Sequence, residues 1–405
     1  MNAQKFNGQR LKEALQFREK KMTELADETG ISKQSLSLYA NGGNVPPFDN
    51  VIKIARVLEF PTDFFMSEDL CTVSTGNTYF RSQASATKKS RNAQKIKLEY
   101  VSKMYEVILN YMNVPELNLP DTTGINIPDD IADVDSEQAI KEIEKLSKLV
   151  REYWNLGNGP IENLQYVLQS NGIIVTGFRD VDIGIDAFSQ QITIDGKMVY
   201  IIALSIGTKP IERLRFDMAH ELGHILMHTW GEDNEEISKD EFNVREKQAN
   251  MFASALLLPK ETFSKSISAY PTNIDYYLAL KKKWKVSMQA MMYRTRQLDI
   301  ISANQFQYMM RIMSKNRYRT HEPGDKPGEI GDTIFQAALD MLFEGGYLTV
   351  RELLKEFGRY GIYLSQSDLE NLMYLCRQSN FPISKFHKTM DFRTQIFEAL
   401  KAKFT

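Results

Sequence analysis

Three histidines and one glutamate lie at helical spacing near the middle of the chain. His220, Glu221 and His224 form the pattern H-E-x-x-H, and His228 follows four residues later. Residues four positions apart share one face of a helix, so the first two imidazoles could bind one zinc ion, with Zn–N bonds of about 2.0–2.1 Å. Glu221 stands beside them and could accept a proton from a water molecule. The pattern therefore predicts metal-assisted hydrolysis.

A zinc site of this kind needs a third protein ligand and keeps one position open for water. Glu246 is expected to supply it, because it lies on the next expected helix in R-E-K-Q-A-N-M-F-A-S-A. Apolar residues of that helix would pack it against the first helix: Ala249, Phe252 and Ala253. The competing acids are Glu235, Glu236 and Glu241. An exposed helix acid is the plain alternative for Glu246, and His228 is expected beside the site rather than on the metal.

The sequence on both sides of these residues predicts a region of mixed helices and strands. A helix is expected from Pro210 to about Thr229, and a second over Lys239–Leu257, which stops at Pro259. Upstream, helices are expected over Glu137–Trp154 and Ile161–Ser170, and strands over Gly172–Phe178, Ala187–Ile194 and Met198–Ser205. The last two strands flank a hairpin signal, Asp195-Gly196. The region 187–205 could also receive an extended peptide substrate as an added strand.

The first 68 residues have the pattern of four short helices. Thr23–Thr29 would be the positioning helix of a helix-turn-helix, Gly30 the turn, and Ser32–Asn41 the recognition helix in the major groove. The residues expected to contact DNA bases or phosphates are Lys33, Gln34 and Ser37, with Tyr39 and Asn41 on the backbone. A helical bundle for protein contacts is the alternative, because Met1–Met66 holds nine basic and eight acidic residues.

The segments on either side of the α+β region are expected to be linkers and helices. Residues 71–98 look like a linker, whose Arg81–Lys97 part carries six basic residues and no acid, followed by a helix over Ile96–Met112. Such a charge run is ordinarily a solvated tether, although it could follow DNA phosphates. Helices are expected over 260–315 and 332–405, with a polar linker at Thr320–Gly331. Leu353–Phe357 and Ser365–Leu372 suggest a helical pair, which is more often a packing unit than a second helix-turn-helix.

Whole-chain properties narrow the class of protein. The 405 residues suggest roughly two to four domains, and the net charge of −2 confines DNA binding to a local patch. Two distant cysteines cannot form a disulfide scaffold and fit a reducing compartment. The longest apolar stretch, Met198–Ile206, is far short of the roughly 20 residues of a membrane helix, and Met1–Gln9 lacks a signal-peptide core. The expectation is a cytoplasmic protein.

Two stretches of this sequence resemble known families. Ile31–Pro46, I-S-K-Q-S-L-S-L-Y-A-N-G-G-N-V-P, resembles the XRE/Cro-type helix-turn-helix family, although Ala40 stands where that family often has Glu. Arg213–His228, R-L-R-F-D-M-A-H-E-L-G-H-I-L-M-H, and Glu246–Pro259, E-K-Q-A-N-M-F-A-S-A-L-L-L-P, resemble the ImmA/IrrE family of metallopeptidases. The resemblance covers roughly residues 1–70 and 150–300.

The resemblance implies specific roles. His220, His224 and Glu246 match the family's zinc ligands, and Glu221 matches its catalytic glutamate. Family members cleave repressor proteins or trigger their loss, in mobile-element induction, stress responses and toxin–antitoxin-like modules. The implied protein is a DNA-binding regulator with zinc metalloendopeptidase activity, whose partners are a double-stranded DNA operator and a repressor substrate. A palindromic operator would call for a homodimer.

The expected fold is multidomain and mainly α. It comprises a helix-turn-helix bundle over 1–70, a basic linker and helix over 71–135, a zincin-like α+β peptidase domain with a small sheet over 136–315, and a helical C-terminal domain over 325–405, the candidate sensor. Two other functions remain open. One is a non-proteolytic transcription regulator whose metal domain senses a ligand, and the other is an interaction protein whose C-terminal region recruits a partner. The intact Glu221 argues against a pure sensor, since ligand binding does not need it.

Overall fold

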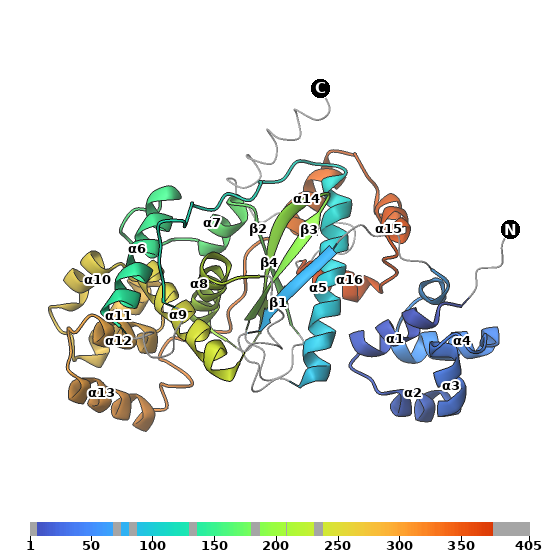
Figure 1. The fold of residues 1–405 in the computed structure, drawn as a ribbon, viewed down its shortest axis with the longest axis horizontal. Helices are drawn as coiled ribbons and strands as arrows, with labels where there is room; N and C mark the ends of the chain where they lie inside the picture. Colours follow the sequence, from blue (N-terminus) through green and yellow to red (C-terminus); the bar gives the residue numbers. More distant parts are fainter. Residues whose placement is uncertain are drawn as a thin grey trace.

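A computed structural model describes residues 6–67, 74–80, 87–128, 136–179, 187–207, 209–230 and 238–375. In this part of the chain, helices surround one four-stranded sheet of order β1-β3-β4-β2 (Figure 1). The strands are β1 Ser74–Phe80, β2 Ile173–Phe178, β3 Ala187–Ile194 and β4 Lys197–Ser205. β3 is antiparallel to both β1 and β4, whereas β2 is parallel to β4. The expected mainly α, multidomain architecture with a small sheet is confirmed.

A tight hairpin joins β3 to β4. Asp195 and Gly196 both have positive φ, 48° and 76°, as a type I′ turn requires, and Ile194 pairs with Lys197 across the turn. β3 therefore has β1 and β4 as neighbours, and β4 has β3 and β2. The expectation that residues 187–205 accept a peptide as an added strand is wrong, because both strands already have a partner on each side.

The sheet is buried on both faces, which explains the nearly continuous apolar sequence of β4. Tyr200, Ile202 and Leu204 belong to one hydrophobic core, while Ile201 and Ala203 belong to another on the opposite face. Alternate residues of a strand point to opposite faces, so one strand contributes to both cores. The sheet therefore separates two helical layers.

The first layer contains the helices that carry the H-E-x-x-H pattern and their supports (Figure 1). α8 packs against β3 and β4, and α9 packs against α8. The bounds are α6 Glu137–Tyr153, α7 Leu164–Ser170, α8 Ile211–Met227, α9 Lys239–Leu257, α10 Lys260–Ile267, α11 Ile274–Trp284, α12 Met288–Gln297 and α13 Ala303–Lys315. The helices and the three strands that the sequence predicts in 136–315 agree with these bounds to within a few residues.

The second layer lies on the opposite face of the sheet. It consists of α5 Lys88–Leu109 and the C-terminal helices α14 Ile334–Glu344, α15 Val350–Arg359 and α16 Gln366–Leu372. The prediction of a linker over 71–98 is wrong for two parts of it, since 74–80 form β1 and α5 begins at Lys88 rather than near Ile96. The side chain of Thr87 accepts a hydrogen bond from the Ser90 amide and starts α5 early. Two other parts of the predicted linker, 71–73 and 81–86, and the last part of the predicted C-terminal helices, 376–405, lie outside the described residues.

The predicted linker Thr320–Gly331 is held against α11 and α12 of the first layer instead of hanging free. Lys281 of α11 forms ion pairs with both Glu322, over 3.0 Å, and Asp325. Glu322 also accepts hydrogen bonds from the amides of Met288 and Gln289 at the start of α12. These contacts satisfy the open amides of a helix N-terminus with a carboxylate, so the segment acts as a strap.

Among the described helices, none combines the length and the apolar composition needed to cross a lipid bilayer.

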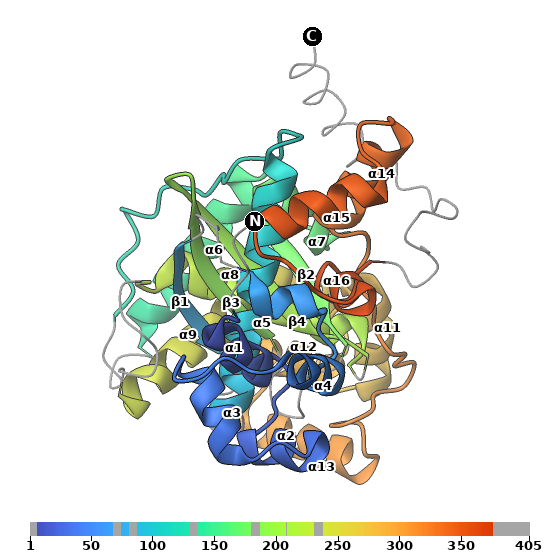
Figure 2. The ribbon, with the colours of Figure 1, turned by 90° about the vertical axis from the view of Figure 1, so that its right-hand side faces the viewer.

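The N-terminal bundle contains α1 Gly8–Phe17, α2 Met22–Thr29, α3 Lys33–Ala40, α4 Phe48–Leu58 and the short helix η1 Thr62–Met66. Gly30 ends α2 with φ of 69°, a left-handed conformation that glycine adopts without strain, and Ser32 caps α3 by accepting from the Ser35 amide. Figure 2 faces this bundle and shows α1 in front of α5.

Three polar contacts fasten α1 to the second layer. The Arg18 guanidinium donates two hydrogen bonds to the Asp368 carboxylate of α16, over 2.7 and 2.6 Å. Arg10 donates to the carbonyl of Gly361, over 3.2 Å. The hydroxyl of Tyr100 on α5 donates to Glu13 over 2.5 Å, and its burial, together with the Glu13 charge, raises the pKa of Tyr100 well above its ordinary value. The N-terminal bundle is therefore joined to the rest of the protein by specific contacts.

Candidate metal centre

α8 presents its two faces to different surroundings. Pro210 precedes its first residue, and Leu214, Met218 and Leu222 bury one side in the core below the sheet. The imidazole side chains of His220 and His224 are buried, with 0% and 1% of each residue exposed. A helix whose polar residues are this deeply buried must provide partners for them, because an unsatisfied buried polar group is costly.

α9 crosses α8 closely at Gly223. A Cβ atom at Gly223 would lie 3.2 Å from the Cα of Ala249 and 3.1 Å from Cδ1 of Phe252. Even a methyl group at Gly223 would therefore require α9 to shift by a few tenths of an ångström. The small residue inside the H-E-x-x-H pattern thus lets the two helices approach, and this approach brings Glu246 to the histidines.

His220, His224 and Glu246 converge on one point. Their ligand atoms all lie within 4.8 Å of one another. The two Nε2 atoms are 2.9 Å apart, Glu246 Oε2 lies 3.4 Å from Nε2 of His220, and Glu246 Oε1 lies 3.2 Å from Nε2 of His224. These are the same three residues that are expected from the sequence to bind zinc.

These separations suit a tetrahedral metal ion. Ligand atoms at about 2.0–2.1 Å from one zinc ion lie about 3.3 Å apart when the geometry is tetrahedral. The two Glu246 separations match that value, and the imidazole pair would need to open by a few tenths of an ångström. Two imidazoles and one carboxylate are also the ligand types that zinc prefers in catalytic sites. The residues present therefore fit a zinc ion.

The other ring nitrogens have partners that orient the imidazoles. Nδ1 of His220 lies 3.1 Å from Oδ1 of Asn250, and Nδ1 of His224 lies 2.9 Å from Nδ1 of His228. Such outer hydrogen bonds fix ring orientation and leave Nε2 for the metal. Asn250 is four residues after Glu246 on α9, so one face of this helix provides both a candidate ligand and the group that orients another.

His228 takes part in a buried chain of hydrogen bonds. Its Nε2 lies 3.0 Å from Oε1 of Gln248, whose Nε2 donates to the carbonyl of Pro128 over 2.6 Å. Burial and the neighbouring His224 lower the pKa of His228 well below its ordinary value, which favours a neutral ring. The structure places His228 beside the three converging residues rather than among them, as expected from the sequence.

The electrostatics of the site favour an ionised Glu246. Burial alone would raise the pKa of its carboxyl group, but hydrogen bonds and charge from His220 and His224 outweigh burial and lower it well below its usual range. A carboxylate is the form that a metal ion binds. Among the competing acids, Glu241 forms an ion pair with Arg245, while Glu235 and Glu236 lie outside the described residues.

Glu221 is fully buried next to the converging residues, and β3 holds it in place. The hydroxyl of Ser189 donates a hydrogen bond to Oε2 of Glu221 over 2.5 Å. Sequence reasoning missed Ser189, Asn250 and Gln248. Asn250 could have been found from its spacing to Glu246, but no local signal marks Ser189, because its strand comes near α8 only in the folded protein.

The predicted DNA-contacting residues separate into two groups. Lys33, Gln34, Ser37 and Asn41 are exposed on α3 and at its end, as a recognition surface requires. Tyr39 is instead 5% exposed and belongs to the core of the bundle, where its hydroxyl accepts a hydrogen bond from Asn50 over 3.2 Å. Its ring also packs edge-to-face on Phe6. The expectation that Tyr39 contacts DNA is therefore corrected to a core position.

Comparison with known proteins identifies both parts of the chain. Residues 11–65 match a family model described as helix-turn-helix, of the XRE type, and residues 178–296 match a peptidase family model described as an IrrE N-terminal-like domain. No curated protein matches the chain. The second match covers α8, α9 and the sheet strands β3 and β4. Residues 11–65 thus form a helix-turn-helix domain of the XRE type, and they are fused to a metallopeptidase-type domain of the IrrE N-terminal-like family at residues 178–296.

Proposed function

We propose that this protein is a DNA-binding regulator with zinc-dependent endopeptidase activity, which cleaves a repressor or a similar regulatory protein and so derepresses genes of a mobile element or a stress response. The observation that supports it most is the convergence of His220, His224 and Glu246 beside a buried Glu221. The match of residues 178–296 to a peptidase family supports the same reading.

In this proposal, each residue of the centre has a distinct role. His220, His224 and Glu246 hold the metal, while Asn250 and His228 keep the two imidazoles in orientation. A bound zinc ion would supply Lewis-acid activation of a water molecule and of the scissile carbonyl group. Glu221 would accept a proton from the attacking water and donate it to the leaving amine, while Ser189 keeps the carboxylate in place.

A pure sensor is the alternative, in which metal or ligand binding changes operator affinity without cleavage. The buried Glu221 favours the peptidase, since placing a carboxylate at 0% exposure is costly and metal binding by three other residues does not need it. The hydrogen bond that Glu221 accepts from Ser189 offsets part of the cost of burying this carboxylate.

The decisive experiment is a cleavage screen. The zinc-loaded full chain is mixed with repressors encoded by neighbouring genes, and fragments are mapped by mass spectrometry. We expect one fixed cut with the wild-type chain and none with Glu221→Gln, which should retain zinc. Operator binding that depends on zinc, without a cut in any partner, would support the sensor instead.

The helix-turn-helix domain, by this proposal, brings the peptidase to its operator. The α3 residues Lys33, Gln34 and Ser37 are exposed for base or phosphate contact. Because operators of this helix-turn-helix class are commonly palindromic, we propose that the protein binds its operator as a homodimer. Sedimentation of the protein–DNA complex would measure the number of chains bound.

A further inference from the structure

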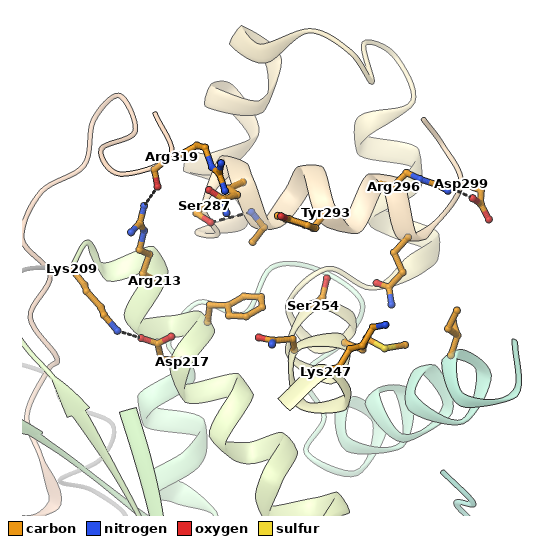
Figure 3. A pocket seen from close by; sticks show the side chains of 17 residues that line it. Lys209, Arg213, Asp217, Lys247, Ser254, Ser287, Tyr293, Arg296, Asp299 and Arg319 are labelled. Carbon is orange, nitrogen blue, oxygen red and sulfur yellow. Dashed lines mark hydrogen bonds and ion pairs between the residues drawn. The ribbon is translucent and has the colours of Figure 1, made fainter. Parts of the chain in front are cut away.

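A large cavity lies next to the candidate metal centre. It is open to solvent, has a volume of about 870 Å³, and is lined mainly by residues of α8, α9 and α12 and of the segment after α13 (Figure 3). Asp217 lines it three residues before His220 on α8, and Asn250 lines it four residues after Glu246 on α9. The cavity therefore begins about one helical turn from the proposed ligands and follows the same two helices.

The lining of this cavity is strongly basic. Its two acidic residues, Asp217 and Asp299, each form an ion pair with a basic residue of the lining: Lys209–Asp217 over 2.8 Å and Arg296–Asp299 over 2.6 Å. Three further basic residues complete the lining: Arg213, Lys247 and Arg319. The lining thus has a net charge of +3, which favours an anionic ligand.

Arg213 and Arg319 come together at one end of the cavity. Arg213 donates a hydrogen bond to the backbone carbonyl group of Arg319 over 2.9 Å (Figure 3). It donates another to the backbone carbonyl group of Thr320 over 3.3 Å. These acceptors are neutral, so they satisfy donors of the guanidinium without neutralising its charge. The positive charge of Arg213 consequently contributes to the field inside the cavity.

A second observation also indicates a ligand. The hydroxyl oxygen of Ser254 is buried and has no hydrogen-bond partner among the described residues, and Ser254 lines the cavity. Buried hydroxyl groups without a partner are uncommon, and a ligand is one way to supply the partner. The lining also holds Phe216, Met251 and Tyr293, so apolar contacts are available beside the charges.

We propose that this cavity binds an acidic stretch of the protein substrate, and that it selects which regulatory protein is cut. The inference rests on the proposed peptidase function. An extended peptide whose scissile bond lies at the metal centre would continue along the α8–α9 crevice, where Asn250 borders both regions. The volume is at the upper end of the roughly 300–1,000 Å³ of small-molecule sites, which leaves room for several side chains.

Binding can be measured without cleavage. The probe is a fluorescein-labelled octapeptide of alternating glutamate and alanine, and its matched control replaces glutamate by glutamine. Fluorescence anisotropy with the zinc-loaded full chain carrying Glu221→Gln should show tighter binding of the acidic peptide. The preference should decrease as salt concentration rises, because ion pairs near solvent are screened.

Two exposed residues of the lining provide the variant. In Lys247→Gln/Arg319→Gln both changes are at the surface, so folding should be retained. Each lost ion pair weakens binding by about two- to fivefold, so the double variant should lose roughly tenfold. The matched control, Lys148→Gln/Lys282→Gln, makes the same charge change at exposed residues outside the lining and should bind as the parent does. Zinc content is measured in the Glu221→Gln parent and in both double variants.

The outcomes separate this inference from the proposed function. Equal affinity for the glutamate and glutamine peptides, or equal losses in both double variants, would overturn it. Tight binding of ATP that the acidic peptide cannot displace would also overturn it, and would assign the cavity to a small-molecule anion. If the acidic peptide binds as expected but no partner is ever cut, the cavity still binds acidic peptides, whereas the peptidase proposal and the role of the cavity in selecting a cut protein both fail.

Discussion

The side chains of Ser189 and Glu221 meet across the boundary between β3 and α8. The Ser189 hydroxyl donates to Oε2 of Glu221 over 2.5 Å, and both residues are 0% exposed. The serine sits at a strand position that pairs with Ile202 of β4. The central part of the sheet therefore fixes the position of the residue to which the proposed mechanism assigns proton transfer.

Replacing Ser189 by alanine should lower cleavage while zinc stays bound. Without this hydrogen bond the Glu221 carboxylate is less firmly oriented, so its proton transfer should be slower. We expect a decrease in kcat of about ten- to hundredfold, since a hydrogen bond to a charged group contributes about 1.5–3 kcal/mol. Ser189→Thr, which keeps the hydroxyl, is the control. An unchanged kcat in Ser189→Ala would remove the positioning role.

Glu246→Gln should abolish tight zinc binding. Loss of outer hydrogen bonds to a metal ligand already weakens affinity by about 10–100-fold, so loss of a ligand should weaken it by more. The control is Glu241→Gln, which changes an acid on the same helix that pairs with Arg245. Zinc affinity is measured by competition with a chromogenic chelator. Equal affinities in the two variants would place the third ligand elsewhere.

The recognition helix should show two kinds of DNA contact. Gln34→Ala should cost about 1–3 kcal/mol for the operator and less for unrelated DNA, as for a base contact. Lys33→Ala should weaken both and reduce the slope of affinity against salt by about one, as for a phosphate contact. Tyr39→Phe should leave operator affinity unchanged, because Tyr39 belongs to the core. A large affinity loss in Tyr39→Phe would contradict the corrected assignment.

The Arg18–Asp368 contact should stabilise the joined form of the two regions. The pair is bidentate and partly buried, with side-chain exposures of 18% and 11%. A double-mutant cycle of Arg18→Met and Asp368→Asn, measured by urea unfolding, should give a coupling energy of about 1–2 kcal/mol. A coupling energy near zero would show that the contact does not fasten the bundle.

The ion pairs of Lys281 with the segment Thr320–Gly331 should make the stability of the protein depend on pH. Burial alone would lower the pKa of Lys281, but hydrogen bonds with Asp325 and Glu322 raise it above its ordinary value of 10.5. A raised folded-state pKa gives stability that is fully present below pH 10.5 and is lost as pH rises through the folded value. The difference in unfolding free energy between the wild type and Lys281→Met should therefore be constant near neutral pH and decrease above pH 10.5. A difference that persists at higher pH would point to packing rather than charge.

The sequence alone determined the elements whose signals are local. The helix from Pro210, the helix Lys239–Leu257 and the Asp195-Gly196 hairpin all appear where their capping, proline and turn residues predict them. Helical spacing was enough to place His220 and His224 on one face, because that relation lies within a single helix. The same reasoning located α3 and the exposed Lys33 and Gln34.

Only the tertiary structure decided the relations between distant segments. β1 looked like a linker because residues 74–80 have no apolar alternation, and they become a strand by pairing with β3. The helical pattern that marked Tyr39 as a contact could not show that its face turns inward. Likewise Ser189 and the basic cavity depend on strands and helices far apart in the chain. Periodicity records which side of an element a residue occupies, whereas the partner on that side is set by how whole elements pack.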